Sequence, residues 1–255
     1  MEGPVSKREI TMFTSRLIAL GIGLLLISTN LYATLQINTT RIIMAGNKKD
    51  TSVRINNVGS SPSLTKVWLS DAETKGLEGG NDRLPFFISP PAALIDAGEA
   101  KVFRFLKLDD AESTLLQDRE TVLWFNVMDI PSKKESDQDK NGIEMVFRTI
   151  IKFFYRPAGL KGTPILAAED LSFTYASSGN KTQVKVANNH PYHVSVNKVS
   201  FDNGAVKKEG EAGMIAPFSN KTFTFDGINP GVRNTIEYRY ITDLGAMITI
   251  NKSLK

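Results

Sequence analysis

The 255-residue chain contains no cysteine, two histidines and two tryptophans. The absence of cysteine excludes a disulfide framework, a thiol nucleophile and a cysteine-ligated zinc or iron–sulfur site. Two histidines leave little material for a histidine metal site or an acid–base relay. The excess of positive over negative charge is also small, because 31 Lys and Arg residues and 27 Asp and Glu residues leave a net charge of +4. Nucleic-acid binders concentrate Lys and Arg on one face, so no nucleic-acid partner is expected.

The first 33 residues differ in character from the rest. Three basic residues precede an uncharged apolar run at 17–33 that ends on the small residue Ala33. This order is typical of a secretory signal peptide, and we predict cleavage after Ala33. The alternative, a membrane anchor, is disfavoured because the strongly apolar part at 17–27 is shorter than the ~20 residues of a spanning helix. We therefore expect no membrane anchor after cleavage, and a fold that is held by its core alone.

Beyond residue 34 the dominant pattern is a period-two alternation of apolar and polar residues in short runs, broken by Gly, Asn, Asp and Pro. Only the stretch 107–120 suggests a turn of helix. Dense short strands of this kind are typical of an antiparallel sandwich. The runs that we expect to be strands are 51–58, 101–108, 121–130, 143–155, 171–177, 182–188, 193–201, 221–227, 234–242 and 246–251.

One interruption divides this pattern. Two prolines and two glycines fall at 157–164, and proline can neither vary its φ nor donate to a strand ladder. We therefore predict two β domains at 34–156 and 160–255. Both are close to the ~100 residues of an immunoglobulin-like module.

Two segments of the first domain are specific when they occur together. WFNVMDIPS (124–132) is followed, after a polar loop, by RTIIKFFYRP (148–157), and the pair resembles the signature of the PapD-like periplasmic pilus chaperones. The resemblance implies an all-β protein with two immunoglobulin-like sandwiches at an angle, no catalytic activity and no cofactor. It extends over essentially the whole mature chain through TTRII (39–43), RINNVG (54–59) and TDLGA (242–246).

The chain departs from the family pattern in two places. Ser132 follows a proline where relatives often have a second proline, and Ala92 follows the proline pair at 90–91 where they often have an arginine. The second departure lies in an expected hairpin. Neither departure touches the residues that the resemblance implies for binding.

By resemblance, Arg41 and Lys152 are the residues that bind the C-terminal carboxylate of a pilus subunit. The chemistry is suitable, because a carboxylate that leaves water needs charge-assisted donors and Arg can bind it through two of them. The alternative is that Lys152 is a solvated charge at a strand edge while Arg41 pairs with a local acid.

By the same resemblance, Ile143, Met145 and Phe147 belong to a strand that is lent to an incomplete subunit, which is donor-strand complementation. An apolar strand at a sheet edge is an aggregation hazard unless a partner covers it. The alternative is that these side chains fill the domain's own core. Alternation places Lys152 on the opposite face, so either the strand twists or bulges, or the two sets contact different parts of the subunit.

A third set concerns the joint between the domains. Glu120, Arg156 and Asp243 match residues that form an inter-domain ion network in relatives, and a bidentate Arg suits that task. Surface ion pairs contribute only about 0–1 kcal/mol, so we expect the network to act on orientation. The alternative is three scattered surface charges.

The short charged loop at 132–142 and the lack of cysteine indicate the short-loop branch of the family.

The resemblance implies a periplasmic chaperone that caps pilus subunits and delivers them to an outer-membrane usher. The exposed edge strand would also allow self-association of the free protein, whose oligomeric state the sequence leaves open. Two other classes stay open on the sequence. A secreted two-module adhesin or receptor ectodomain shares the sandwich pattern without needing the Arg41 and Lys152 pair. A secreted β-sandwich enzyme would need an acid or metal cluster that the sequence does not offer.

Overall fold

The computed structural model describes residues 34–73, 84–131 and 145–254. Three predictions lie outside those residues: the signal peptide, the charged loop at 132–142 and the role of Ile143. In the described part of the chain, no helix is both long and apolar enough to cross a membrane. The described residues form two β-sandwich domains, each with its own hydrophobic core.

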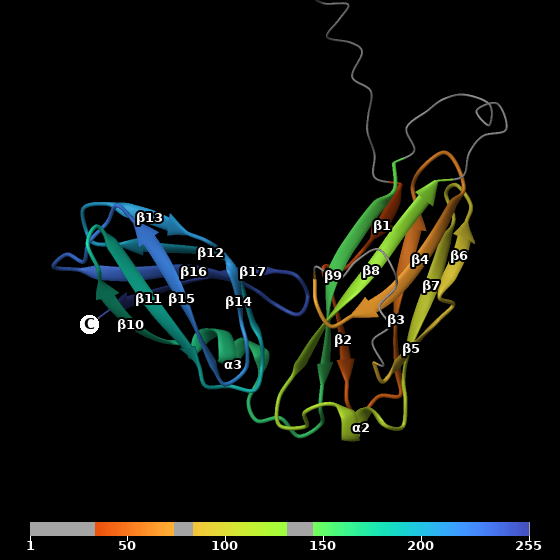
Figure 1. The fold of residues 1–255 in the computed structure, drawn as a ribbon, viewed down its shortest axis with the longest axis horizontal. Coiled ribbons are helices and arrows are strands. Elements are labelled where there is room, and N and C mark those ends of the chain that lie inside the picture. Colours follow the sequence, from red (N-terminus) through yellow and green to blue (C-terminus); the bar gives the residue numbers. More distant parts are fainter. Residues whose placement is uncertain (1–33, 74–83, 132–144, 255) are drawn as a thin grey trace, which may run out of the picture. The chain divides into compact units, whose positions relative to one another are not determined.

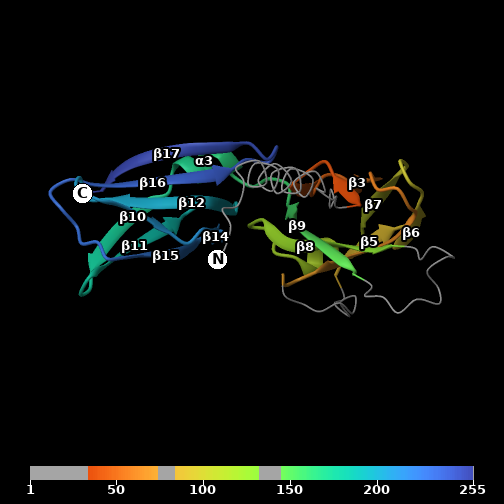
Figure 2. The same cartoon turned by 90° about the horizontal axis from the view of Figure 1, so that it is seen from above.

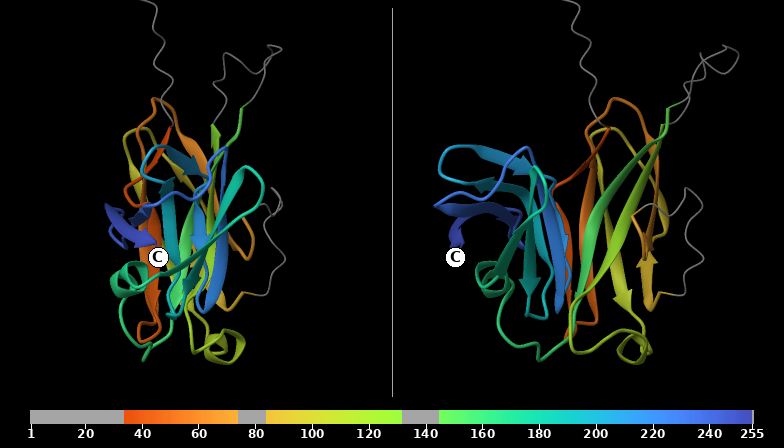
Figure 3. Two further views of the ribbon diagram at one scale, coloured as in Figure 1. Left: turned by 90° about the vertical axis from the view of Figure 1, so that its left-hand side faces the viewer. Right: turned by 60° about the vertical axis from the view of Figure 1, so that its left-hand side comes forward.

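The first domain packs two sheets face to face (Figures 1 and 3). One sheet has the strand order β1 (Leu35–Ile37), β3 (Asp50–Asn57), β7 (Ala100–Lys107), β5 (Phe86–Ser89). The other has the order β2 (Arg41–Ala45), β9 (Phe147–Arg156), β8 (Thr121–Pro131), β4 (Ser63–Ser70), β6 (Ala92–Ile95). The short helix α2 (Ala111–Thr114) lies within the segment where the sequence predicts a helical turn.

The first two strands of the domain belong to different sheets. β1 pairs antiparallel with β3, whereas β2 crosses to the other sheet and pairs parallel with β9. β2 is short and pairs only with residues 152–156 of β9. Within the described residues, the stretch 147–151 therefore has a neighbouring strand on the β8 side alone. This unpaired stretch is called the open edge of β9 below.

Aromatic side chains dominate the core of the first domain. The ring centroid of Phe105 lies 5.0 Å from that of Phe125 and 5.0 Å from that of Phe153, and all three side chains are fully buried. A large apolar side chain contributes about 1.5–3 kcal/mol when it leaves water. The core thus replaces the disulfides that the sequence lacks.

The second domain pairs a three-stranded sheet with a five-stranded sheet, and Figure 2 shows the two layers. The smaller sheet has the order β10 (Ser172–Ser177), β11 (Lys181–Asn188), β15 (Ser219–Asp226). The larger has the order β13 (Lys207–Gly210), β12 (Val194–Asp202), β16 (Asn234–Ile241), β17 (Met247–Leu254), and β14 (Gly213–Ile215) also pairs with β12.

Every run that the sequence predicts as a strand overlaps a strand of the structure. The reason is visible in β11, where buried and exposed residues alternate without exception from Lys181 to Val186. The helix α3 (Pro164–Glu169) begins at the last proline of the interruption and belongs to the second domain, since Ala167 and Ala168 are part of its core. Thr163 caps α3 by accepting a hydrogen bond from the Leu166 amide at 3.1 Å. Six residues are too few to show a helical period.

The prediction of a hairpin at the proline pair 90–91 is wrong. β5 before the prolines pairs with β7, and β6 after them pairs with β4 in the opposite sheet. The chain therefore passes from one sheet to the other at this point. Prolines suit such a crossing because they cannot donate to a ladder in either sheet.

Candidate functional site

The open edge of β9 begins at the apolar residue Phe147, and Met145, which the sequence predicts to belong to the same strand, lies two residues before it. Met145 is 57% exposed and Phe147 is 50% exposed, so neither fills the core of the domain. Phe147 is the first residue of β9, and the β8–β9 register runs from Phe147 to Tyr155 without a shift. Since no bulge interrupts this register, Phe147 and Lys152 lie on opposite faces of the sheet. The register therefore excludes a bulge as the way to bring the two side chains to one face.

Arg41 and Lys152 are neighbours across two parallel strands. Arg41 is the first residue of β2 and pairs with Lys152 of β9, so their side chains share one face of the sheet. On its other side Lys152 pairs with Trp124 of β8, and its Nζ lies 5.5 Å from the centroid of the Trp124 ring. The Trp face attracts the ammonium group. Two cations thus meet where β2 begins and the open edge ends.

Burial disfavours both charges. Arg41 is only 7% exposed, and burial lowers the pKa of its guanidinium, although the carboxylates of Asp243 and Glu120 oppose this shift. Burial, and next the charge of Arg41, lower the pKa of Lys152, although the carboxylate of Glu73 opposes this shift. Neither cation forms an ion pair with a carboxylate of the described residues. Buried charges are normally paired, so the site is suited to an anion that comes from outside the chain.

The Arg41 guanidinium is only partly satisfied by the protein. Its Nη1 donates to the carbonyl oxygen of Ile241, in the second domain, at 3.1 Å. Its Nε is buried and has no hydrogen-bond partner in the structure as described. The side chain therefore contacts both domains and keeps a donor for a further group.

The structure brings Glu120, Arg156 and Asp243 together. Arg156 donates to Glu120 Oε1 from Nε at 3.0 Å and from Nη2 at 2.8 Å. It also donates to Asp243 Oδ2 from Nη1 at 2.8 Å and to Asp243 Oδ1 from Nη2 at 3.1 Å. The Glu120 side chain is 2% exposed and that of Asp243 is 38% exposed. The alternative of three scattered surface charges does not hold, because the three side chains contact one another and Glu120 is buried.

His193 completes this network, and the sequence did not predict its part. Its backbone amide donates to Glu120 Oε2 at 2.9 Å, and its Nδ1 lies 3.0 Å from the same oxygen. Its ring packs against Phe154, with centroids 5.6 Å apart. The neighbouring His190 pairs instead with Asp170 at 2.8 Å. Among the described residues, no group of side chains is arranged to hold a metal ion.

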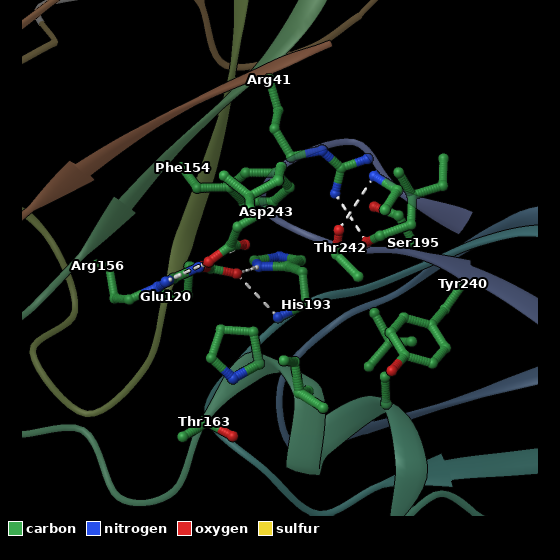
Figure 4. Close-up of a pocket in the computed structure, with 17 residues that line it drawn as sticks. Arg41, Glu120, Phe154, Arg156, Thr163, His193, Ser195, Tyr240, Thr242 and Asp243 are labelled. Carbon is green, nitrogen blue, oxygen red and sulfur yellow. Dashed lines mark hydrogen bonds and ion pairs between the residues drawn. The ribbon is translucent and has the colours of Figure 1, made fainter. Parts of the chain in front are cut away.

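A pocket of about 360 Å³ lies beside this network, and both domains line it (Figure 4). Arg41 and Phe154 come from the first domain, while Ser195, Tyr240 and the helix α3 come from the second. No motif in the sequence indicated this pocket, because its walls come from segments that are far apart in the chain.

Comparison with known proteins gives the relatives of this chain. A family model described as "Pili and flagellar-assembly chaperone, PapD N-terminal domain" matches residues 34–161. A second, "Pili assembly chaperone PapD, C-terminal domain", matches residues 166–252. The probable fimbrial chaperone YadV of Escherichia coli strain K12 is 34% identical over 231 residues, which are 89% of this chain and 92% of YadV.

Solved structures agree with the sequence relatives. The crystal structure of the YadV chaperone superposes with a TM-score of 0.73 and 32% identity, over 87% of this chain and all of that chain. The SafB chaperone of Salmonella enterica, solved in complex with the SafA pilin, has a TM-score of 0.69 and 24% identity, over 89% of this chain and 99% of that chain. SafB is similar in fold. From the two family models and the identity with YadV, the chain belongs to the PapD-like family of pilus-assembly chaperones, with two immunoglobulin-like domains.

Proposed function

We propose that this protein is a periplasmic chaperone that binds pilus subunits along the open edge of β9 and delivers them to an outer-membrane usher. The observation that carries the proposal is the coincidence of two features. The open edge of β9 ends at Lys152, and there the Arg41 and Lys152 charges lie side by side without a carboxylate partner in the described residues. Export to the periplasm rests on the predicted signal peptide at 1–33. No cofactor and no catalytic step is needed.

The pairing pattern defines how a subunit strand would bind. A strand added beside residues 147–151 would lie in line with β2, which continues the same edge from residue 152 onward. A subunit whose C-terminal carboxylate reaches Arg41 and Lys152 must run toward Lys152, which is the direction of β9 itself. The added strand is therefore parallel to β9. Main-chain hydrogen bonds along an exposed edge provide affinity in this mode of recognition.

Apolar side chains at the start of β9 and just before it would supply the second part of the binding energy. Phe147, which begins the open edge, and Met145, two residues before it, are exposed, and covering each in a subunit groove would contribute about 1.5–3 kcal/mol. This is donor-strand complementation, in which the chaperone lends an apolar strand to an incomplete subunit. The same role for Ile143 is a prediction from the sequence. The pilin bound to SafB supports a partner of this class.

The carboxylate would be held by charge-assisted hydrogen bonds. Arg41 keeps an unused buried donor, and the pKa of Lys152 is lowered by burial and by Arg41, so an anion would relieve both groups. Hydrogen bonds to charged groups contribute about 1.5–3 kcal/mol each. The anchor also sets the register of the subunit strand along β9.

Co-purification tests the anchor. When the Arg41→Ala or the Lys152→Ala variant is co-expressed with a candidate subunit, we expect little complex to be recovered. The circular dichroism spectrum of each variant should stay that of the wild type. Lys101→Ala is the matched control, because Lys101 is an exposed cation on β7 in the other sheet. Unchanged recovery with both anchor variants would count strongly against the proposal.

A second experiment tests the lent strand. Phe147→Asp should abolish subunit capture and leave the chaperone folded. Phe87→Asp is a matched control, because Phe87 is 51% exposed on β5 of the other sheet, against 50% for Phe147. Unfolding of the Phe147 variant would instead mean that this residue belongs to the core. The same variant should weaken self-association of the free protein in analytical ultracentrifugation.

A further inference from the structure

We propose that the pocket beside Arg41 receives the side chain of the subunit's C-terminal residue and selects a large apolar one. This inference rests on the proposed function, because it takes the carboxylate anchor as given. It adds a specificity site to that anchor, so the chaperone would recognise the chemistry of the last residue as well as its charge.

The position of the pocket follows from its lining. Arg41 is one of its walls, whereas Lys152 lies outside it. A carboxylate held between these two side chains would lie at the mouth of the pocket. The Cα of the same residue is about 1.5 Å from the carboxylate carbon, so its side chain begins at the entrance. The volume of about 360 Å³ is enough for a large side chain.

The walls are mainly apolar. Figure 4 shows the ring of Phe154 and the ring of Tyr240 on different sides of the space, with α3 closing it below. An apolar side chain that enters would exchange water for these surfaces and gain the usual burial energy. The apolar residues that line it include Phe154, Ile165, Val194, Ile241 and Leu244.

Two polar atoms at the pocket point to a ligand that carries acceptors. Arg41 Nε and Ser195 Oγ are buried, and within the described residues neither has a hydrogen-bond partner. Arg41 is 7% exposed and Ser195 is 5% exposed, and both side chains line the pocket. Leaving a buried polar group unpaired costs about 1–3 kcal/mol. A C-terminal residue offers carboxylate oxygens to these donors and an apolar group to the walls.

A larger side chain on the helix α3 can fill the pocket. Ile165 lines it and is 50% exposed, so a larger residue there does not disturb either core. The next residue, Leu166, is 47% exposed and lines a different pocket, formed with residues such as Gly162 and Phe218. Ile165→Trp and Leu166→Trp are therefore a matched pair on one helix.

The experiment uses the full chain and acetylated Ser–Val repeat octapeptides ending in Gly, Leu or Phe, each as the free acid and as the C-terminal amide. Isothermal titration calorimetry is expected to show that the Leu and Phe acids bind at least tenfold more tightly than the Gly acid, which corresponds to about 1.4 kcal/mol. Ile165→Trp should reduce this preference to less than twofold, while Leu166→Trp should keep it.

The outcomes separate the two proposals. If the acids bind more tightly than the amides but Gly, Leu and Phe acids bind equally, the pocket inference is overturned and the anchor stands. Equal binding of acids and amides, or no binding by any acid, overturns the anchor and the pocket together. If Ile165→Trp keeps the preference, or if both tryptophan variants lose it equally, the pocket is not the place that selects the residue.

Discussion

Replacing Arg156 by leucine removes the centre of the network that joins the two domains. Glu120 then keeps its two contacts with His193 and, among the described cations, the longer-range attraction of Arg41, and its side chain is 2% exposed. Removing one partner of a buried ion pair costs about 3–5 kcal/mol, because the other charge stays buried without compensation. The Arg156 side chain is itself 19% exposed, so we take the lower end and expect a loss of about 3 kcal/mol.

The second carboxylate of the network should behave differently. Asp243 is 38% exposed, and solvent screens its pair with Arg156. Exposed pairs contribute about 0–1 kcal/mol, so Asp243→Asn should change the free energy of unfolding by less than about 1 kcal/mol. The contrast between the two variants separates a buried interaction from an exposed one within a single network.

Urea unfolding followed by tryptophan fluorescence measures these changes, since both Trp68 and Trp124 lie in the first domain. Arg104→Leu is the control, because Arg104 pairs with Asp50 at the surface and is 61% exposed. Equal losses for Arg156→Leu and Arg104→Leu, within about 0.5 kcal/mol, would refute the reasoning. They would mean that the burial of Glu120 does not set the strength of the network.

Two further predictions concern single side chains. Burial and Arg41 lower the pKa of Lys152 below 10.5, and a carboxylate binds only the charged form of this side chain. Binding of the peptide acid, titrated from about pH 7 to about pH 10, should therefore weaken as the pH rises. The Lys152→Arg variant should bind equally over this range, and a flat profile for the wild type would contradict the assignment. Asn57 is 1% exposed, and its Nδ2 donates to the carbonyls of Ser61 at 2.8 Å and Ile95 at 2.9 Å. Asn57→Ala should lower the free energy of unfolding by about 2–4 kcal/mol in the same urea assay, and a loss below about 1 kcal/mol would show that water replaces the amide.

The period-two pattern and the breakers between its runs were enough to predict the two sandwiches. Local alternation decides which side chains can face a core, and strands such as β11 and β16 follow it closely. The family resemblance added the positions of Arg41, Lys152, Glu120 and Arg156. The two sandwiches could be predicted because alternation is a local pattern that recurs along the whole chain, whereas the binding roles of the charged residues stay predictions.

Other features were decided only by the tertiary structure. Alternation does not say which strands pair, so it could not show that β2 begins only opposite Lys152 and leaves the open edge of β9 before it. Nor could it place His193 on Glu120, 73 positions earlier in the chain, or put Ser195 and Arg41 around one pocket. The sequence by itself determined the sandwiches and named the charged residues. The packing of distant segments determined which charges are buried, which edge is unpaired and where a pocket forms, because burial and register are properties of contacts between segments that the local pattern does not encode.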